Sequence, residues 1–106
     1  MALTRNFKDT IKERVARDAE FRKALLEESI DSFLSGDMET GKSMLRDYIN
    51  ATIGFEQLGS SVEISPKSLM RMFSPQGNPR ATNIFSIISA LQQNAGIQLH
   101  VQTVSH

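Results

Sequence analysis

The segment from Ser65 to Arg71 combines residue types that bind phosphates and base edges. It reads Ser-Pro-Lys-Ser-Leu-Met-Arg and places Lys67 and Arg71 four residues apart. On a helix this spacing puts both cations on one face, one turn apart. Lys and Arg side chains donate to phosphate oxygens and to guanine edges, and Ser68 can donate to base or backbone. The segment therefore predicts recognition of double-stranded DNA rather than catalysis.

Two residues mark where this helix begins. Ser65 is a good N-cap, and Pro66 suits the first helical position because its missing N–H is not needed there. We expect the helix to run from Pro66 to about Phe73, with free N–H groups in its first turn available to a phosphate. Its inward residues are expected to be Leu69, Met72 and Phe73, and its outward residues Pro66, Lys67, Ser68 and Arg71.

A second short helix is predicted directly before it, from Phe55 to Val62. Two short helices cross closely only where the residue at the crossing is small, and Gly59 occupies that position. The segment 74–79 contains two prolines and a glycine, so it must be a loop. Arg80 follows the loop, where it is expected to hold the flanking DNA backbone or, alternatively, to close the loop.

Four further elements must position this pair. A first helix with the apolar stripe Phe7, Ile11 and Val15 is expected to be capped by Thr4 and Asn6. A second helix spans 19–35 between an Asp18 cap and Gly36. A third runs from an Asp37 cap to about Thr52, and a last one from a Thr82 cap to Gly96. In the third helix we expect Met44, Leu45, Tyr48 and Ile49 to face inward, and Lys42, Arg46 and Asp47 to face outward.

After Gly96 the pattern alternates, with Ile97, Leu99 and Val101 separated by polar residues, which predicts a strand. A lone strand leaves its backbone N–H and C=O groups unpaired. Since no other segment is typical of a strand, we expect it to pair with its own copy in a two-fold homodimer.

Composition narrows the classes of function. A chain of 106 residues with 40% hydrophobic residues is typical of one globular domain. It has no cysteine, which excludes disulfides, thiolate catalysis and cysteine-ligated metals. Net charge is zero, yet the charged residues between Ser65 and Thr82 are only Lys67, Arg71 and Arg80. Without a membrane-length apolar run or a signal peptide, a cytoplasmic protein is expected.

Catalytic and metal sites have little support in the sequence. The acidic cluster Glu27, Glu28 and Asp31 is typical of a solvated helix face, and Tyr48 beside Asp47 is typical of an aromatic residue at the core edge. His100 and His106 are too few for a zinc site. We therefore expect no enzyme activity, no metal and no cofactor.

The sequence resembles the lambda-repressor-like helix-turn-helix regulators, and more narrowly the antidote proteins of prophage and addiction modules. The resemblance covers roughly residues 18–101. It is carried by Gly54, Phe55 and Leu58, by Ser65, Ser68 and Leu69, by Gly77, Asn78 and Pro79, and by Ala90 and Leu91. The family usually has glycine in the turn at the position of Glu63, so here a non-glycine residue must accept a left-handed conformation.

The resemblance implies an all-α, lambda-repressor-like bundle with an N-terminal helical extension and a short C-terminal strand. The helical extension is expected at 1–36, the helix-turn-helix DNA-binding domain at 37–96, and the strand and tail at 97–106. It implies a DNA-binding antitoxin that represses its own operon as a dimer and neutralises a small toxin. We expect residues 7–34 to contribute to toxin binding, because the half of the chain that contains the predicted helix-turn-helix does not need them for its core. The alternatives are a stand-alone prophage regulator and an interaction module that neutralises a toxin without binding DNA.

Overall fold

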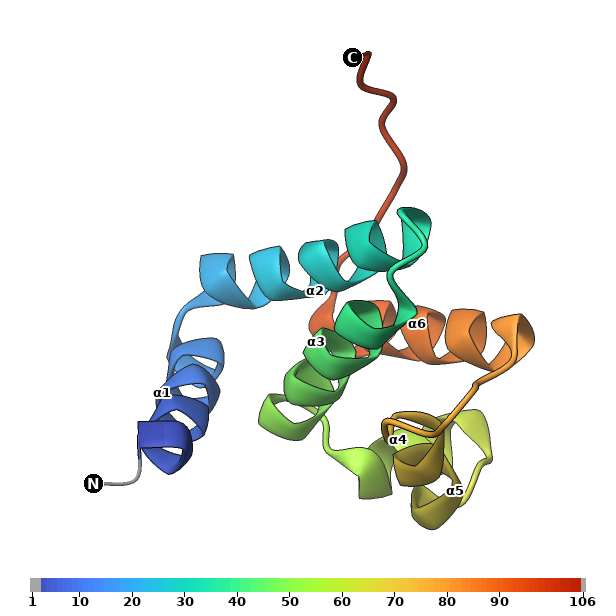
Figure 1. Cartoon of the computed structure of the whole chain (residues 1–106), viewed down its shortest axis with the longest axis horizontal. Helices are drawn as coiled ribbons and strands as arrows, with labels where there is room; N and C mark the ends of the chain where they lie inside the picture. The colour runs from blue at the N-terminus through green and yellow to red at the C-terminus, as the bar shows by residue number, and fades with distance from the viewer. Residues whose placement is uncertain (1–2, 106) are drawn as a thin grey trace.

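Figure 1 shows a computed structural model that describes residues 3–105, with side chains described from Thr10 to Ser105. Every regular element within residues 3–105 is an α-helix, which confirms the all-α class. The helices are α1 (Leu3–Arg17), α2 (Ala19–Leu34), α3 (Met38–Ala51), α4 (Phe55–Val62), α5 (Pro66–Met72) and α6 (Ala81–Ala95). None of the helices in this range is long and apolar enough to cross a membrane.

The first helix begins earlier than the sequence predicts. Because α1 starts at Leu3, Thr4 and Asn6 lie inside it, and their side chains lie outside the described residues. A capping side chain is worth only about 1 kcal/mol, so it does not prevent a helix from starting upstream. Val15 is fully buried and Ile11 is half-buried, as the apolar stripe requires, while the side chain of Phe7 lies outside the described residues.

Two aspartates begin the next two helices, as predicted. The N–H of Phe21 donates to the Asp18 carboxylate, and this hydrogen bond is the main cause that lowers the pKa of Asp18. The hydroxyl and the N–H of Thr40 lower the pKa of Asp37 in the same way. Each carboxylate accepts a bond from an N–H that the helix itself cannot satisfy. The α2–α3 connection contains Gly36 at φ 88°, the left-handed conformation that the sequence predicts.

A single core cluster draws on five of the helices. Its fully buried members include Leu26 of α2, Ile49 of α3, Leu58 of α4, Leu69 of α5 and Leu91 of α6. Burying a side chain of this size stabilises the fold by about 1.5 to 3 kcal/mol. Because Leu26 belongs to the cluster, α2 contributes to the core that α4, α5 and α6 share, contrary to our expectation.

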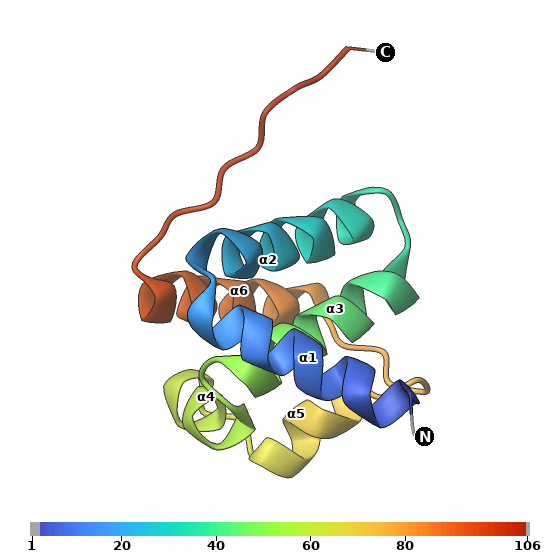
Figure 2. The same ribbon diagram turned by 90° about the vertical axis from the view of Figure 1, so that its left-hand side faces the viewer.

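The core holds the short helices at one end of the molecule. Figures 1 and 2 show α3 and α6 between α2 on one side and α4 and α5 on the other. The Phe55 and Phe73 rings pack 6.1 Å apart between their centroids, which joins the start of α4 to the end of α5. The position of α5 is therefore set by tertiary packing as well as by its own seven residues.

The start of α6 differs by two residues from the prediction. Arg80 is the N-cap residue, with φ −74° and ψ 151°, and its side chain makes no capping hydrogen bond. Thr82 is already inside the helix, because Ala81, a stronger helix former, takes the first helical position. The helix ends at Gly96, which adopts the predicted left-handed conformation at φ 69°.

No strand is present between residues 97 and 105 of the single chain, where the sequence predicts one from Ile97 to Val101. The N–H of Ile97 bonds to the carbonyl of Gln92, and the N–H of Leu99 bonds to the Gln92 side chain. A strand forms only against another extended segment, and within the described residues none lies beside this one. Pairing with a second copy stays a prediction.

Candidate nucleic-acid interface

Local chemistry fixes where α5 begins. Ser65 is extended, at φ −60° and ψ 145°, and its hydroxyl oxygen accepts a 3.1 Å hydrogen bond from the N–H of Ser68. Pro66 is the first helical residue, as predicted. The Ser65 and Ser68 hydroxyl groups also share a hydrogen bond, with their oxygens 3.0 Å apart. Since the cap occupies the Ser68 N–H, the first turn has fewer free N–H groups for a phosphate than an uncapped helix.

The turn between α4 and α5 depends on Gly59, which is buried. A Cβ on this residue would lie 2.6 Å from the carbonyl oxygen of Ile64 and 3.4 Å from Cδ of Pro66. Real Cβ atoms do not approach a backbone oxygen so closely, so the residue must be glycine for α4 and the turn to pack as they do. The N–H groups of Glu63 and Ile64 bond to the Gly59 carbonyl and close the end of α4.

Glu63 adopts the left-handed conformation that its place in the turn demands, at φ 58° and ψ 44°. It is the single non-glycine residue with positive φ in the described chain. This conformation costs a residue with a Cβ about 1 to 2 kcal/mol, which the packing of α4 and α5 must offset. The left-handed conformation of Glu63 therefore strains the turn without removing it.

Two cations from α3 hold the far end of α5. Arg46 donates to the carbonyl of Phe73 at 3.3 Å, and the Lys42 ammonium donates to the carbonyls of Ser74 at 3.0 Å and Gly77 at 2.8 Å. These carbonyls belong to the end of α5 and to the loop after it, where acceptors lack helical partners. The two side chains thus fix both the helix and the loop to the core.

Lys42 corrects one of our expectations, because the sequence predicts it on the outward face and the structure buries it. Only 3% of the side chain is exposed. Lys42 precedes the buried Leu45 and Ile49 by three and seven residues, so it lies on the inward stripe of α3. The spacing was the available signal, and the general preference of lysine for the surface obscured it. Burial is tolerated because three backbone carbonyls and Glu39 accept from its ammonium.

The outward side of α5 is open to solvent. Lys67 and Arg71 are exposed, whereas Leu69 between them is fully buried and Phe73 after them is 1% exposed. Pro66 and Ser68 are half-buried at the edge of this face. The helix therefore brings together five of the six predicted site residues, namely Ser65, Pro66, Lys67, Ser68 and Arg71.

Arg80 is separate from that group. It is exposed at the beginning of α6, beyond the loop that Lys42 holds, and within the described side chains no hydrogen bond or ion pair joins it to α5. The loop itself is tightly seated, since a Cβ at Gly77 would overlap the carbonyl oxygens of Arg71 and Met72. Arg80 thus projects from a fixed loop and not from a free one.

Charge is strongly divided along the chain. All twelve Asp and Glu residues lie between residues 1 and 63, and none occurs from Ile64 to His106. The basic residues of that second part are Lys67, Arg71 and Arg80. The exposed face of α5 is consequently a small positive surface, and Glu63 in the preceding turn is the nearest acidic residue along the chain. Such a surface attracts anions even though the whole chain has a formal net charge of zero.

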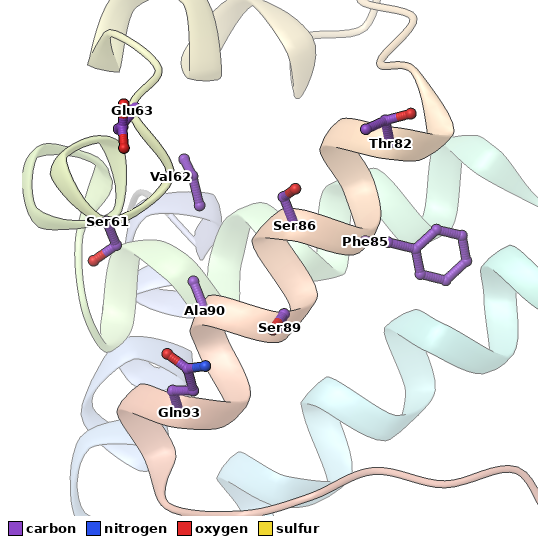
Figure 3. Close-up of a pocket in the computed structure, with 9 residues that line it drawn as sticks. All are labelled: Ser61, Val62, Glu63, Thr82, Phe85, Ser86, Ser89, Ala90 and Gln93. Carbon is purple, nitrogen blue, oxygen red and sulfur yellow. The ribbon is translucent and has the colours of Figure 1, made fainter.

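A groove lies beside this surface, between the end of α4 and the outer side of α6 (Figure 3). Its lining is mostly small and hydroxyl-bearing: Ser61, Val62, Glu63, Thr82, Phe85, Ser86, Ser89, Ala90 and Gln93. Figure 3 shows Phe85 pointing away from the α4 side of the groove. Glu63 is its one ionisable lining residue.

Tyr48 lies within the core and not at a catalytic position. Its side chain is 2% exposed, and burial raises its pKa. A tyrosine with a raised pKa stays protonated at neutral pH and is a poor general base. No group of three or more His, Asp or Glu side chains that could hold a metal occurs among the described residues.

No family model, curated protein or solved structure matches this chain. The functional interpretation therefore depends on the geometry and charge of α5 and its surroundings.

Proposed function

We propose that this protein is a sequence-specific transcriptional regulator that binds double-stranded DNA. In this proposal α4 and α5 are the helix-turn-helix of a lambda-repressor-like bundle, and α5 enters the major groove. The observation that carries the proposal is that Lys67 and Arg71 are exposed on a short helix whose opposite side, at Leu69, is fully buried. A helix held in this way presents its cations without covering them.

The proposal gives each site residue a role. Arg71 reaches a guanine edge or a phosphate, and Lys67 does the same one turn earlier. The Ser68 hydroxyl reaches a base or a backbone oxygen, and Arg80 holds the flanking phosphate. Ser65 and Pro66 place the first turn of α5, and Ser65 is the cap already described.

The cellular role that we propose is that of an antitoxin. Acting as a dimer in the cytoplasm, and without enzyme activity, it represses its own operon and neutralises a small toxin encoded beside it. A regulator bound at a symmetric site is expected to be a dimer, because operator symmetry mirrors protein symmetry. A small toxin-like reading frame next to the gene, and rescue of growth when both are expressed, would distinguish an antitoxin from a stand-alone prophage regulator.

A DNA-binding titration tests the proposal. Fluorescence anisotropy with the duplex upstream of the gene, and with a scrambled duplex of equal composition, should show tight, salt-dependent and sequence-selective binding. Each phosphate contact should contribute about −0.9 to the slope of log K against log salt. Arg71→Ala should weaken specific binding by about 1 to 3 kcal/mol if the residue reads a guanine.

Matched variants separate the role of α5 from that of bulk charge. Lys67→Gln should weaken binding and flatten the salt slope by about 1 if Lys67 contacts a phosphate. Lys23→Gln removes the same charge from α2, where Lys23 pairs with Glu20 at 3.3 Å, and should leave affinity unchanged within about twofold. Absence of binding at 50 mM salt would refute DNA binding and favour an interaction module that neutralises a toxin without DNA.

A further inference from the structure

A second exposed surface lies on the far side of the molecule from α5. It is a groove of about 720 Å³ between α2 and α6, lined partly by the segment that follows α6. Four large apolar side chains around it are mostly exposed, with exposed fractions of 67% for Leu34, 68% for Phe85, 76% for Val101 and 79% for Val104. Apolar side chains gathered in this way usually mark a contact with another molecule.

The C-terminal tail, residues 97–105, has an unusual chemistry. It contains no Lys, Arg, Asp, Glu or Pro. Beyond the Leu99 N–H, which Gln92 accepts, no backbone hydrogen bond is made by residues 100–105 within the described chain. Proteins keep an exposed edge of this kind from associating by placing charges or proline on it. The tail has neither safeguard, so it is suited to pair.

We propose that a second copy of this chain covers this surface, with the two tails paired as antiparallel strands. Antiparallel pairing about a two-fold axis uses the same edge of both tails. The backbone N–H and C=O groups of one tail can therefore bond to those of an identical tail. Leu99 and Val101, which lie on the same face of a strand, then bury their side chains together with Phe85 and Leu34.

Charge favours this occupant. The α2 wall of the groove contains Glu27, Glu28 and Asp31, and no Lys or Arg lines the groove. An arriving tail of the same chain brings no acidic side chain toward that wall. A two-fold contact made by α2 itself would instead bring acidic walls together, so the tail is the segment by which the copies meet.

This surface leaves the nucleic-acid interface open. Figures 1 and 2 show the tail leaving the molecule on the side of α2, opposite to α4 and α5. The proposed function requires a dimer, and this inference says how the dimer forms, so the inference rests on the proposed function. Association is measured below without DNA, so failure of the dimer and failure of DNA binding are separate results.

Sedimentation equilibrium of the full chain tests the association. Wild type should be a dimer at micromolar concentration. Val101→Lys should raise the dissociation constant at least tenfold, and Phe85→Ser should raise it in the same direction. Gln102→Lys adds the same charge to the neighbouring residue, whose side chain faces the opposite side of a strand, and should change it less than threefold. A monomeric wild type, or equal effects at positions 101 and 102, would overturn the proposal.

A cysteine scan tests the antiparallel arrangement. Because the chain has no cysteine, one cysteine at a time can be placed at each of positions 100 to 104. Antiparallel pairing brings only the residues at the two-fold axis opposite their own copies, so oxidation should crosslink one position strongly and its neighbours progressively less. Equal crosslinking at all five positions would indicate parallel pairing, and uniformly slow crosslinking would indicate no pairing; either result overturns the proposal.

Discussion

The buried ammonium of Lys42 offers the sharpest test of how α5 is held in place. Lys42→Met removes the charge and keeps a side chain of similar length. The substitution leaves the carbonyls of Ser74 and Gly77 without the donor that now lies 3.0 Å and 2.8 Å away. The bond to the Pro75 carbonyl is 3.5 Å long, and the Glu39 partner is 71% exposed, so neither contributes much.

The size of the effect follows from those two shorter bonds. A hydrogen bond to a charged group contributes about 1.5 to 3 kcal/mol net, so two contribute about 3 to 6 kcal/mol. Burying the ammonium opposes this gain, and methionine avoids that cost. We therefore expect Lys42→Met to lower the free energy of unfolding by about 3 kcal/mol, which corresponds to a fall in Tm on the order of 10 °C.

Urea unfolding followed by circular dichroism measures the change, with Lys67→Met as the control. Lys67 is exposed on α5, so the same substitution there should alter stability by no more than about 0.5 kcal/mol. If Lys42→Met is no more destabilising than Lys67→Met, the ammonium does not anchor the loop and another contact must position α5. Because the loop after α5 is then no longer held, we also expect folded Lys42→Met to lose sequence-selective DNA binding.

Three other experiments test the remaining local arguments. Gly59→Ala places a Cβ 2.6 Å from a backbone carbonyl oxygen and should destabilise the fold by about 2 kcal/mol in urea titrations, whereas Ser60→Ala at the exposed neighbour should not. Glu63→Gly relieves the left-handed strain and should raise the unfolding midpoint by an amount equivalent to about 1 kcal/mol; a lower midpoint would contradict the account. The pKa values of Asp18 and Asp37 are lowered on folding, so stability should fall as pH drops below about 4, and the double variant Asp18→Asn, Asp37→Asn should flatten that fall in acid titrations.

Much of the helical architecture could be predicted from residues close together in the sequence. Asp18, Asp37 and Ser65 all cap helices where the sequence places them, because a cap depends on bonds to backbone groups three residues away. Gly59 was also predictable, since only the smallest residue allows such a close approach between α4 and the turn.

Features that depend on distant partners were missed. The spacing of Lys42 within α3 indicates an inward position, but it does not reveal the carbonyls more than thirty residues later that accept from its ammonium. Leu26 joins the core of the second half through the packing of α2 on α3, so α2 is not a separate extension as far as the core is concerned. The predicted strand at 97–101 does not form within one chain. Alternating apolar and polar residues favour a strand, but a strand also needs a second extended segment to pair with.

The candidate site was predicted as a set of residue types, and the structure supplies their exposure. The sequence could propose that Lys67 and Arg71 face outward, but only the packing of Leu69 and Phe73 determines which side of α5 is open. Arg80 was grouped with them because it follows the Asn-Pro turn, and it is the N-cap residue of α6, after the loop that Lys42 holds.

An NMR titration tests the central claim most directly. With labelled protein and the duplex upstream of its gene, the backbone amides from Ser65 to Arg71 and the amide of Arg80 should show the largest shifts, while those of α2 stay in place apart from general line broadening. Shifts concentrated on α2 and the C-terminal tail, or no shifts at low salt, would contradict a DNA-contacting role for the exposed side of α5.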